Sequence, residues 1–362
     1  MDIPDRIKKL REKLVEKEVD GILISQQDNR RYLSGFDGSA GYLLITHQDV
    51  ILATDFRYVE QSKRQAPDYK LFQITGKMSE WFMELISGRN LKRLGFEAED
   101  VTFAIYQQLS DILRENQLNL QFVPLDGLVE SLRAIKDAQE IKLITRAIEI
   151  TDKAVEYIEE IIHPSMTELE VAWELERFQR EHGSQALPFD VIVASGPNAA
   201  LPHAQPSKHK IKEGEPVLID IGARVDGYVS DLSRTICLGS PDDNFKKVYD
   251  IVLGAQLATI ELIKEGMTGE EADNMARIVI EQSGYGDTFG HSLGHGVGLA
   301  EHEQPRLGPR SSDILTSGMV FSIEPGIYIS GWGGVRIEDL AVLVDGKIKV
   351  LSKAHKLKTR GV

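Results

Sequence analysis

The chain has 362 residues, 42% of them apolar and 27% charged, as in an ordinary globular protein, and this length favours two domains. Its net charge of −14 argues against a nucleic-acid partner, because phosphate binding needs clustered Lys and Arg. No apolar run approaches the roughly 18 residues of a membrane span, so we expect no membrane partner. Cys237 is the only cysteine, and residues 1–14 lack the apolar stretch of a signal peptide; we therefore expect a cytoplasmic protein.

The first part of the chain alternates between helical and strand patterns. The predicted strands are 21–24, 41–46, 50–54, 69–74, 94–97 and 121–124. Helical segments lie before and between them, which predicts an α/β domain over residues 1–128. No G-x-G-x-x-G follows a strand, so nothing indicates a dinucleotide site.

A long helical period from Ser131 to Ile158 opens the second domain, which we place at residues 129–362. This domain contains an internal repeat. Each copy has a helix with a capping box, a His-x-Gln-Pro segment, a glycine, an apolar strand and a carboxylate, in that order. The landmarks are Thr167, His203, Gly214 and Asp220 in the first copy, and Thr268, His302, Gly318 and Glu324 in the second. The repeat predicts an α+β domain with pseudo-two-fold symmetry and a site at its centre.

The apolar strand of the first copy leads into a predicted hairpin with two acidic residues. If Val225 and Asp226 form its loop, Asp220 lies opposite Asp231; if Asp226 and Gly227 form it, Asp231 is the diagonal neighbour of Asp220. Both registers put the two carboxylates on one face. Because like charges repel, we expect a metal ion, an arginine such as Arg234, or a shared proton between them.

The second copy contains a second hairpin and a cluster of histidines. We expect one strand over 320–329 and another over 335–344, carrying Glu324 and Glu338, although Pro325 disturbs the register. Three histidines, His291, His295 and His302, fall within twelve residues and lie among glycines. The glycine density argues against a helix and for close backbone approach.

Four carboxylates and at least one histidine form a ligand set rich in oxygen. Such a set suits Mn²⁺, Co²⁺, Fe²⁺ or Zn²⁺. It also exceeds the needs of one ion, whereas two ions about 3.5–4 Å apart would use all of it and generate a bridging hydroxide. The expected reaction is hydrolysis of an amide or ester.

These motifs resemble those of the pita-bread metallopeptidases, and most closely the Xaa-Pro peptidases, aminopeptidase P and prolidase. The segments that carry the resemblance are Asp226-Gly-Tyr-x-Ser-Asp231, Gly294-His-Gly-x-Gly298, His302-Glu-x-Pro305, Ile323-Glu-Pro-Gly326 and Arg336-Ile-Glu-Asp339. The resemblance implies a creatinase/aminopeptidase-type pita-bread fold for the second domain and a creatinase-type fold for the first. It also implies a homodimer that cleaves peptides with proline at the second position.

The resemblance further implies roles for individual residues. The ligands of two divalent ions, Mn²⁺ or Co²⁺ before Zn²⁺ or Fe²⁺, would be Asp220, Asp231, His295, Glu324 and Glu338. Glu324 would also act as general base on the bridging water. His203 and His302 would orient the substrate and stabilise the tetrahedral intermediate. His291 would line the pocket for the proline ring, and Arg336 would support the site and the carboxyl side of the substrate.

Other functions fit parts of the sequence. Gly290-His-Ser292-Leu-Gly294 matches the nucleophile elbow of a serine hydrolase, although the preceding residues do not form a strand pattern. A non-catalytic binding protein of the same fold would be expected to have lost metal ligands, and none is missing here. A metal-free creatinase-like enzyme, a methionine aminopeptidase and an aminopeptidase of broader specificity are further alternatives within the fold. The sequence leaves dipeptidase and aminopeptidase activity open.

Overall fold

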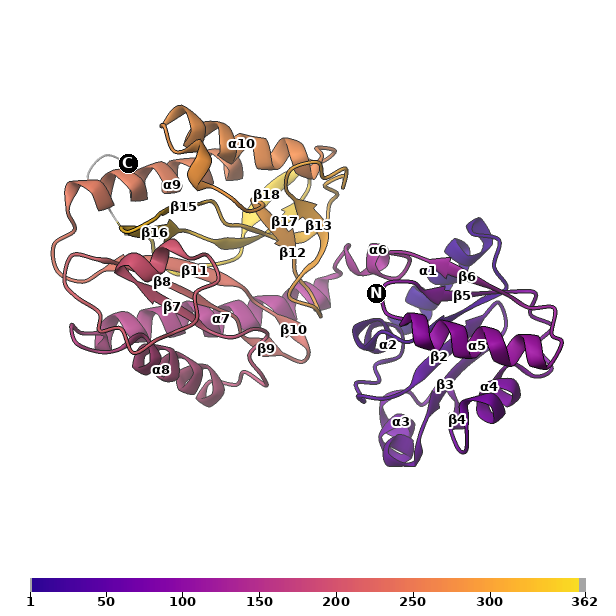
Figure 1. The fold of residues 1–362 in the computed structure, drawn as a ribbon. Helices are drawn as coiled ribbons and strands as arrows, with labels where there is room; N and C mark the ends of the chain where they lie inside the picture. Colours follow the sequence, from indigo (N-terminus) through magenta and orange to yellow (C-terminus); the bar gives the residue numbers. More distant parts are fainter. Residues whose placement is uncertain (1, 358–362) are drawn as a thin grey trace. The chain divides into compact units, whose positions relative to one another are not determined.

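The computed structural model describes residues 2–357, which divide into two compact units with the boundary along the chain between Arg133 and Ala134 (Figure 1). Between Asp2 and Leu357 no helix is long and apolar enough to cross a membrane.

The first unit is built around a six-stranded mixed sheet in the order β4-β3-β2-β1-β5-β6, in which only β2 runs against its neighbours. Its strands are β1 (Gly21–Ile24), β2 (Tyr42–Thr46), β3 (Val50–Thr54), β4 (Lys70–Gln73), β5 (Arg93–Glu97) and β6 (Gln121–Leu125). Its helices are α1 (Ile3–Glu16), α2 (Gln27–Ser34), α3 (Val59–Gln65), α4 (Met78–Ile86), α5 (Phe103–Glu115) and α6 (Glu130–Arg133). The predicted α/β alternation is therefore confirmed for this part of the chain.

The second unit consists of two halves, each with two helices against a sheet (Figure 1). The first half contains α7 (Ala138–Ile161), α8 (Glu168–Glu181), β7 (Ile192–Ser195), β8 (Pro216–Ile221), β9 (Arg224–Val225), β10 (Tyr228–Val229) and β11 (Leu232–Cys237). Its main sheet has the order β11-β8-β7. The apolar faces of α7 and α8 cover this sheet, because Val155, Ile158 and Leu175 pack with Val217 and Ile219 in one core.

The second half repeats this plan with more strands. It contains α9 (Asp243–Leu262), α10 (Gly269–Gln282), β12 (Gly294–Gly296), β13 (Glu303–Leu307), β14 (Val320–Ile323), β15 (Gly326–Ile329), β16 (Gly333–Arg336), β17 (Asp339–Val344) and β18 (Lys347–Val350). Its main sheet has the order β13-β12-β14-β17-β18, and β15 pairs with β16 alone. Val252, Ala276, Phe321 and Leu343 belong to the core between these helices and strands.

The internal repeat is visible at the start of the second helix of each half, α8 and α10. Both of these helices open with the predicted capping box, in which Thr167 or Thr268 accepts the N–H of a glutamate three residues on. The same threonines form isolated β-bridges, Thr167 with Lys210 and Thr268 with Ile314. The two helix starts therefore dock against corresponding loops.

Three predicted elements are wrong in detail. The helical stretch from Ser131 to Ile158 is interrupted, because Asp137 caps a new helix, α7, with its carboxylate on the N–H groups of Gln139 and Glu140. The expected strand 320–329 is split into β14 and β15, since Pro325 has no N–H to continue the ladder. The expected strand 335–344 is likewise split into β16 and β17, and the two breaks hold Glu324 and Glu338.

Two glycines of the second half provide a matched stability test. A Cβ at Gly254, inside α9, would meet nothing within 4 Å, so Gly254→Ala should stabilise the protein by about 0.5–1 kcal/mol through helix propensity. A Cβ at Gly269, the first residue of α10, would lie 2.0 Å from the carbonyl oxygen of Arg306, so Gly269→Ala should destabilise it by about 1–3 kcal/mol. Denaturant unfolding of both variants measures this, and equal effects would contradict the close packing at Gly269.

Candidate metal centre

The first hairpin adopts the second of the two predicted registers. Val225 pairs with Tyr228, which makes Asp226 and Gly227 the loop, and Asp220 pairs with Ser233. Continuing this register places Asp231 opposite Gly222, as the diagonal neighbour of Asp220 on the same face. Asp231 lies between β10 and β11 and is buried. The two carboxylates are therefore held side by side, as the alternation predicted.

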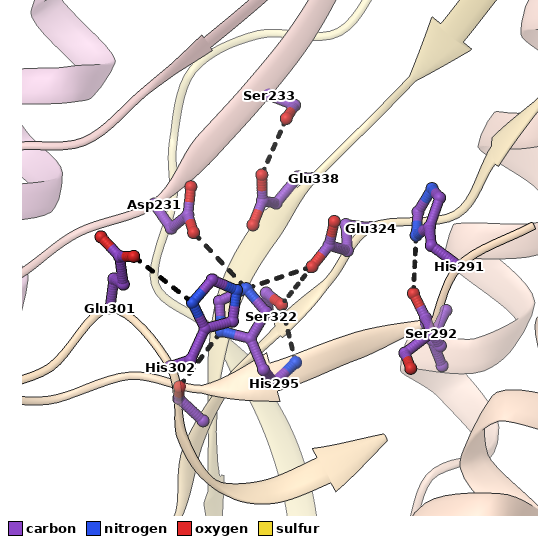
Figure 2. Close-up of polar contacts among 12 residues, drawn as sticks. Asp231, Ser233, His291, Ser292, His295, Glu301, His302, Ser322, Glu324 and Glu338 are labelled. Carbon is purple, nitrogen blue, oxygen red and sulfur yellow. Dashed lines mark hydrogen bonds and ion pairs between the residues drawn. The ribbon is translucent and has the colours of Figure 1, made fainter. Parts of the chain in front are cut away.

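The second hairpin aligns its two acids as well. Ile323 pairs with Asp339 and Gly326 pairs with Arg336, so the same register puts Glu324 opposite Glu338 at the two strand breaks. Glu338 is only 1% exposed and accepts the hydroxyl of Ser233 at 2.8 Å. Ser233 belongs to β11 of the first half, so this hydrogen bond ties the two hairpins together across the pseudo-two-fold (Figure 2).

His295 reaches the carboxylates from β12. Its ring atom Nδ1 lies 3.1 Å from the carbonyl oxygen of Gly296, and its backbone N–H donates to Ser322 Oγ. Its Nε2 lies 3.3 Å from Glu324 Oε1 and 3.6 Å from Asp231 Oδ2 (Figure 2). When Nδ1 donates its proton to the carbonyl, Nε2 is free to bind a cation, as in most histidine–metal sites.

Glycines allow the close approach that the sequence suggested. A Cβ at position 294 would lie 2.0 Å from the carbonyl oxygen of Ser322, and one at position 296 would lie 2.2 Å from that of Gln304. Only glycine fits at Gly294 and Gly296, on either side of His295.

The cluster has the donor atoms that a divalent cation needs. Three buried oxygens, Asp220 Oδ1, Asp231 Oδ1 and Glu338 Oε1, have no hydrogen-bond partner among residues 2–357. Asp231, His295 and Glu338 each offer one ligand atom, and these atoms lie within 4.8 Å of one another. Buried carboxylate oxygens without partners are costly, and a cation would satisfy them.

The pKa values show the same excess of negative charge. Burial raises the pKa of Asp231 and of Glu338 well above the usual carboxyl range, and the neighbouring carboxylates raise both further. For Glu324, burial acts in the same direction, but the hydrogen bond and charge of His295 outweigh it and lower the pKa to about 2. Burial also opposes the charged form of His295, yet the hydrogen bond to Glu324 raises its pKa.

An arginine does lie beside the first pair of acids, but it is Arg336 and not Arg234. Arg336 Nη2 donates to Asp220 Oδ2 at 2.6 Å, while Arg234 is buried against Asp339 at 2.7 Å. The other nitrogens of Arg336 donate to Ser233 Oγ and to the hydroxyl of Tyr328. Arg336 therefore supports the site, and its donors are engaged on the protein side rather than directed at a substrate carboxylate.

All nine site residues predicted from the sequence line one cavity of about 660 Å³. They are His203, Asp220, Asp231, His291, His295, His302, Glu324, Arg336 and Glu338. The ring of His302 lies 4.0 Å from that of His295 between centroids. His291 Nδ1 donates to the carbonyl oxygen of Ser292, and its Nε2 forms a hydrogen bond with the hydroxyl of Tyr328, each at 2.8 Å (Figure 2 shows the former).

Several residues around the cavity were missed by sequence reasoning. Tyr328 joins His291 to Arg336, and Ser322 joins the N–H of His295 to Glu324. Arg306 lies on β13 in register with His295 and lines the cavity. Its position could have been found by recognising that Gly294–Leu307 folds back as a hairpin. The contacts of Tyr328 with His291 and of Ser322 with the N–H of His295 join segments remote in sequence.

The serine-hydrolase alternative does not fit the geometry. The residues before Ser292 form a short 3₁₀ helix at Gly286–Thr288 rather than a strand. Ser292 Oγ lies 3.4 Å from two guanidinium nitrogens of Arg306, and the neighbouring His291 contacts the carbonyl of Ser292. No imidazole is placed to activate this hydroxyl within residues 2–357.

Comparison with known protein families supports a metallopeptidase. Residues 142–345 match the sequence profile of metallopeptidase family M24. The chain belongs to this family. Residues 6–135 match the creatinase/prolidase N-terminal domain, so the two-domain creatinase-type and pita-bread architecture is confirmed. Members of family M24 are metal-dependent peptidases, so the chain is a hydrolase that needs divalent metal ions.

Several relatives match the chain over nearly its full length. A solved Xaa-Pro dipeptidase from Bacillus anthracis is 42% identical, covers 98% of this chain and 99% of its own, and superposes with a TM-score of 0.94. An Xaa-Pro dipeptidase from Pyrococcus horikoshii is 38% identical over 98% of this chain and 99% of its own length. An X-Pro aminopeptidase from Thermotoga maritima is 35% identical, covers 94% and 97%, and has a TM-score of 0.87. The relatives of this M24 chain thus include both kinds of peptidase.

Replacing one candidate ligand should weaken metal binding. Asp231→Asn removes a carboxylate whose pKa is raised by burial and by its acidic neighbours, and it should weaken divalent-metal affinity by about 10-fold or more. Elemental analysis after chelation and reloading with Mn²⁺ measures the bound metal. The matched control is Asp226→Asn at the exposed loop of the same hairpin, which should bind metal as the parent does. Full metal content in Asp231→Asn would contradict its assignment to the centre.

Proposed function

We propose that this M24 peptidase is an Xaa-Pro dipeptidase that hydrolyses the bond before a C-terminal proline. The observation that carries the proposal is Arg306, a guanidinium at the wall of the metal cavity that contacts no carboxylate among residues 2–357. Two relatives of nearly full length named Xaa-Pro dipeptidase, at 37–38% identity, support the same substrate.

We propose five ligands for two divalent ions, Mn²⁺ or Co²⁺ in the first place. They are Asp220, Asp231, His295, Glu324 and Glu338. The partnerless oxygens of Asp220, Asp231 and Glu338 support this set. Divalent ions held there would polarise the substrate carbonyl and supply a water of lowered pKa. Ser233, Ser322 and Arg336 would keep the ligands in place through the hydrogen bonds that they form with Glu338, Glu324 and Asp220.

Glu324 and the cavity histidines would act directly on the peptide. Glu324, an ionised carboxylate beside His295, would accept the proton of the attacking water. His302, whose ring is tilted against that of His295, and His203 would orient the substrate carbonyl and stabilise the negative charge that develops on it. Burial lowers the pKa of His291, so its neutral ring, held by Tyr328, would form the wall for the proline side chain.

We propose that Arg306, rather than Arg336, binds the carboxylate of the substrate. The guanidinium of Arg336 donates to Asp220, Ser233 and Tyr328, whereas the guanidinium of Arg306 has, among residues 2–357, two contacts of 3.4 Å to the hydroxyl of Ser292. A bidentate guanidinium–carboxylate pair would reward a free C-terminus directly after proline. A longer peptide has an amide at this place, so the arrangement favours a dipeptidase over an aminopeptidase.

Domain limits, assembly and location complete the proposal. We propose domains at 1–128 and 129–362, a homodimer, and a cytoplasmic location, for which the lone Cys237 is suited.

A panel of three substrates tests the function. After chelation, the protein is reloaded with Mn²⁺, Co²⁺ or Zn²⁺ and assayed on an Xaa-Pro dipeptide, an Xaa-Pro-Xaa tripeptide and the same tripeptide with Ala for Pro. Metal-dependent cleavage of the dipeptide alone is expected. Cleavage of the proline tripeptide would identify an aminopeptidase, cleavage of the alanine tripeptide a broader specificity, and inactivity with every metal a binding protein.

The role of Arg306 is tested by comparing charged and neutral substrates. Arg306→Ala should raise KM for the dipeptide by about 10- to 100-fold, because a charge-assisted pair contributes about 1.5–3 kcal/mol. KM for the corresponding dipeptide amide, which has no carboxylate, should be nearly unchanged by the same substitution. The matched control is Arg310→Ala, which removes an exposed arginine three residues beyond β13. Equal losses on acid and amide would contradict carboxylate binding.

A further inference from the structure

The loop that carries His203 is held by one buried carboxylate, that of Glu168. Glu168 is the first residue of α8 and is completely buried. Its Oε1 accepts the N–H and the hydroxyl of Ser195, at 2.7 and 3.0 Å. Its Oε2 accepts the N–H and the hydroxyl of Ser207, at 3.0 and 2.6 Å, and Asn198 donates to both oxygens.

These donors bracket the histidine in sequence. Ser195 ends β7, Asn198 lies in the 3₁₀ helix Gly196–Ala200, and Ser207 follows the His203 segment. Because one rigid carboxylate joins the two ends, the residues between them are closed into a short loop. His203 is exposed on this loop and lines the metal cavity.

The second half of the domain holds its corresponding loop without a glutamate at this helix position. The N–H of Leu169 donates to Ser207 O in the first half, and the N–H of Glu270 donates to Ser311 O in the second. This correspondence makes Gly269 the counterpart of Glu168 and Ser311 the counterpart of Ser207. Ser311 Oγ donates to the carbonyl of Arg306 at 2.6 Å, in the space that a side chain at Gly269 would need.

The difference between the halves follows from what comes after each histidine. His302 is followed by β13, whose pairing with β12 fixes the loop through the sheet. No strand follows His203 before β8 begins at Pro216. Glu168 thus supplies by side chain the support that β13 supplies by backbone.

The carboxylate is required in this place by the chemistry of its partners. Each oxygen accepts one backbone N–H, from Ser195 or Ser207, and neither N–H can reverse its role. In Glu168→Gln, the amide NH₂ would face one of these N–H groups, while the volume of the side chain stays the same. One end of the loop would therefore lose its anchor.

We propose that Glu168 is a positioning residue that holds His203 at the reaction site. This inference rests on the proposed function, in which His203 acts on the substrate carbonyl. Glu168 touches neither the candidate metal ligands nor the substrate, so its removal should lower kcat through His203 and leave metal content and KM unchanged.

A double-mutant cycle on the metal-loaded full chain tests the proposal, with kcat and KM for an Xaa-Pro dipeptide measured for each variant. His203→Ala should lower kcat by about 10²-fold, as for loss of one oxyanion donor. Glu168→Gln should lower it by about 10- to 100-fold in the parent but by less than about 2-fold in His203→Ala. The matched control, Glu170→Gln, removes an exposed carboxylate two residues on in the same helix and should change kcat equally little in both backgrounds.

The outcomes separate the two levels of the proposal. If His203→Ala is fully active, the proposed role of His203 fails. If His203→Ala lowers kcat as expected and Glu168→Gln lowers kcat by the same factor in that background as in the parent, the positioning role fails. Loss of bound metal in Glu168→Gln would also overturn positioning through His203. If Glu168→Gln does not fold, Asn198→Ala, which removes one donor and leaves both serines, replaces it in the cycle, with a smaller but equally non-additive loss expected.

Discussion

Four carboxylates forced together in a buried pocket are the constraint on which this structure depends. Asp220 is paired with Arg336, Asp231 and Glu324 are paired with His295, and the raised pKa values of Asp231 and Glu338 show that this compensation is incomplete. A protein that places such charges at its core without a cation would lose stability for no gain. The surrounding hydrogen bonds form a frame that fixes the orientations of these side chains, as a site for divalent ions requires.

The frame is built from two β-hairpins that meet through Ser233. Each hairpin places its acids on one face by simple register, and each is interrupted where its acid must turn toward the centre. The breaks at Asp231, Glu324 and Glu338 remove residues from the ladder without changing the register on either side. The interruptions cost backbone hydrogen bonds, and the stiff apolar strands beside them keep the geometry precise enough for metal binding.

Sequence patterns predicted those parts of the site that depend on residues close together in the chain. The two-residue period placed Asp220 beside Asp231, and glycines around His295 indicated close backbone approach. Alternation along the strand could not show whether Glu324 and Glu338 share a face, because Pro325 interrupts the strand. The pairing of the flanking strands decides the register across this interruption. Tyr328, and the presence of Arg336 rather than Arg234 beside Asp220, could not be predicted from spacing, since each depends on which distant segments meet. Arg306 could have been placed by recognising that Gly294–Leu307 folds back as a hairpin.

The internal repeat explains why the two halves of the domain could not simply remain copies. Both halves must hold a histidine-bearing loop against the same pocket, but only the second needs strands that carry His295 and Arg306 into it. The pairing of β12 with β13 also fixes the loop that carries His302. In this arrangement the carbonyl of Arg306 occupies the space beside Gly269. The first half has no such sheet, so a buried glutamate at the equivalent position replaces the backbone support with a side chain. A pseudo-symmetric fold thus supports an asymmetric site, because one helix position can be glycine in one copy and a charged anchor in the other.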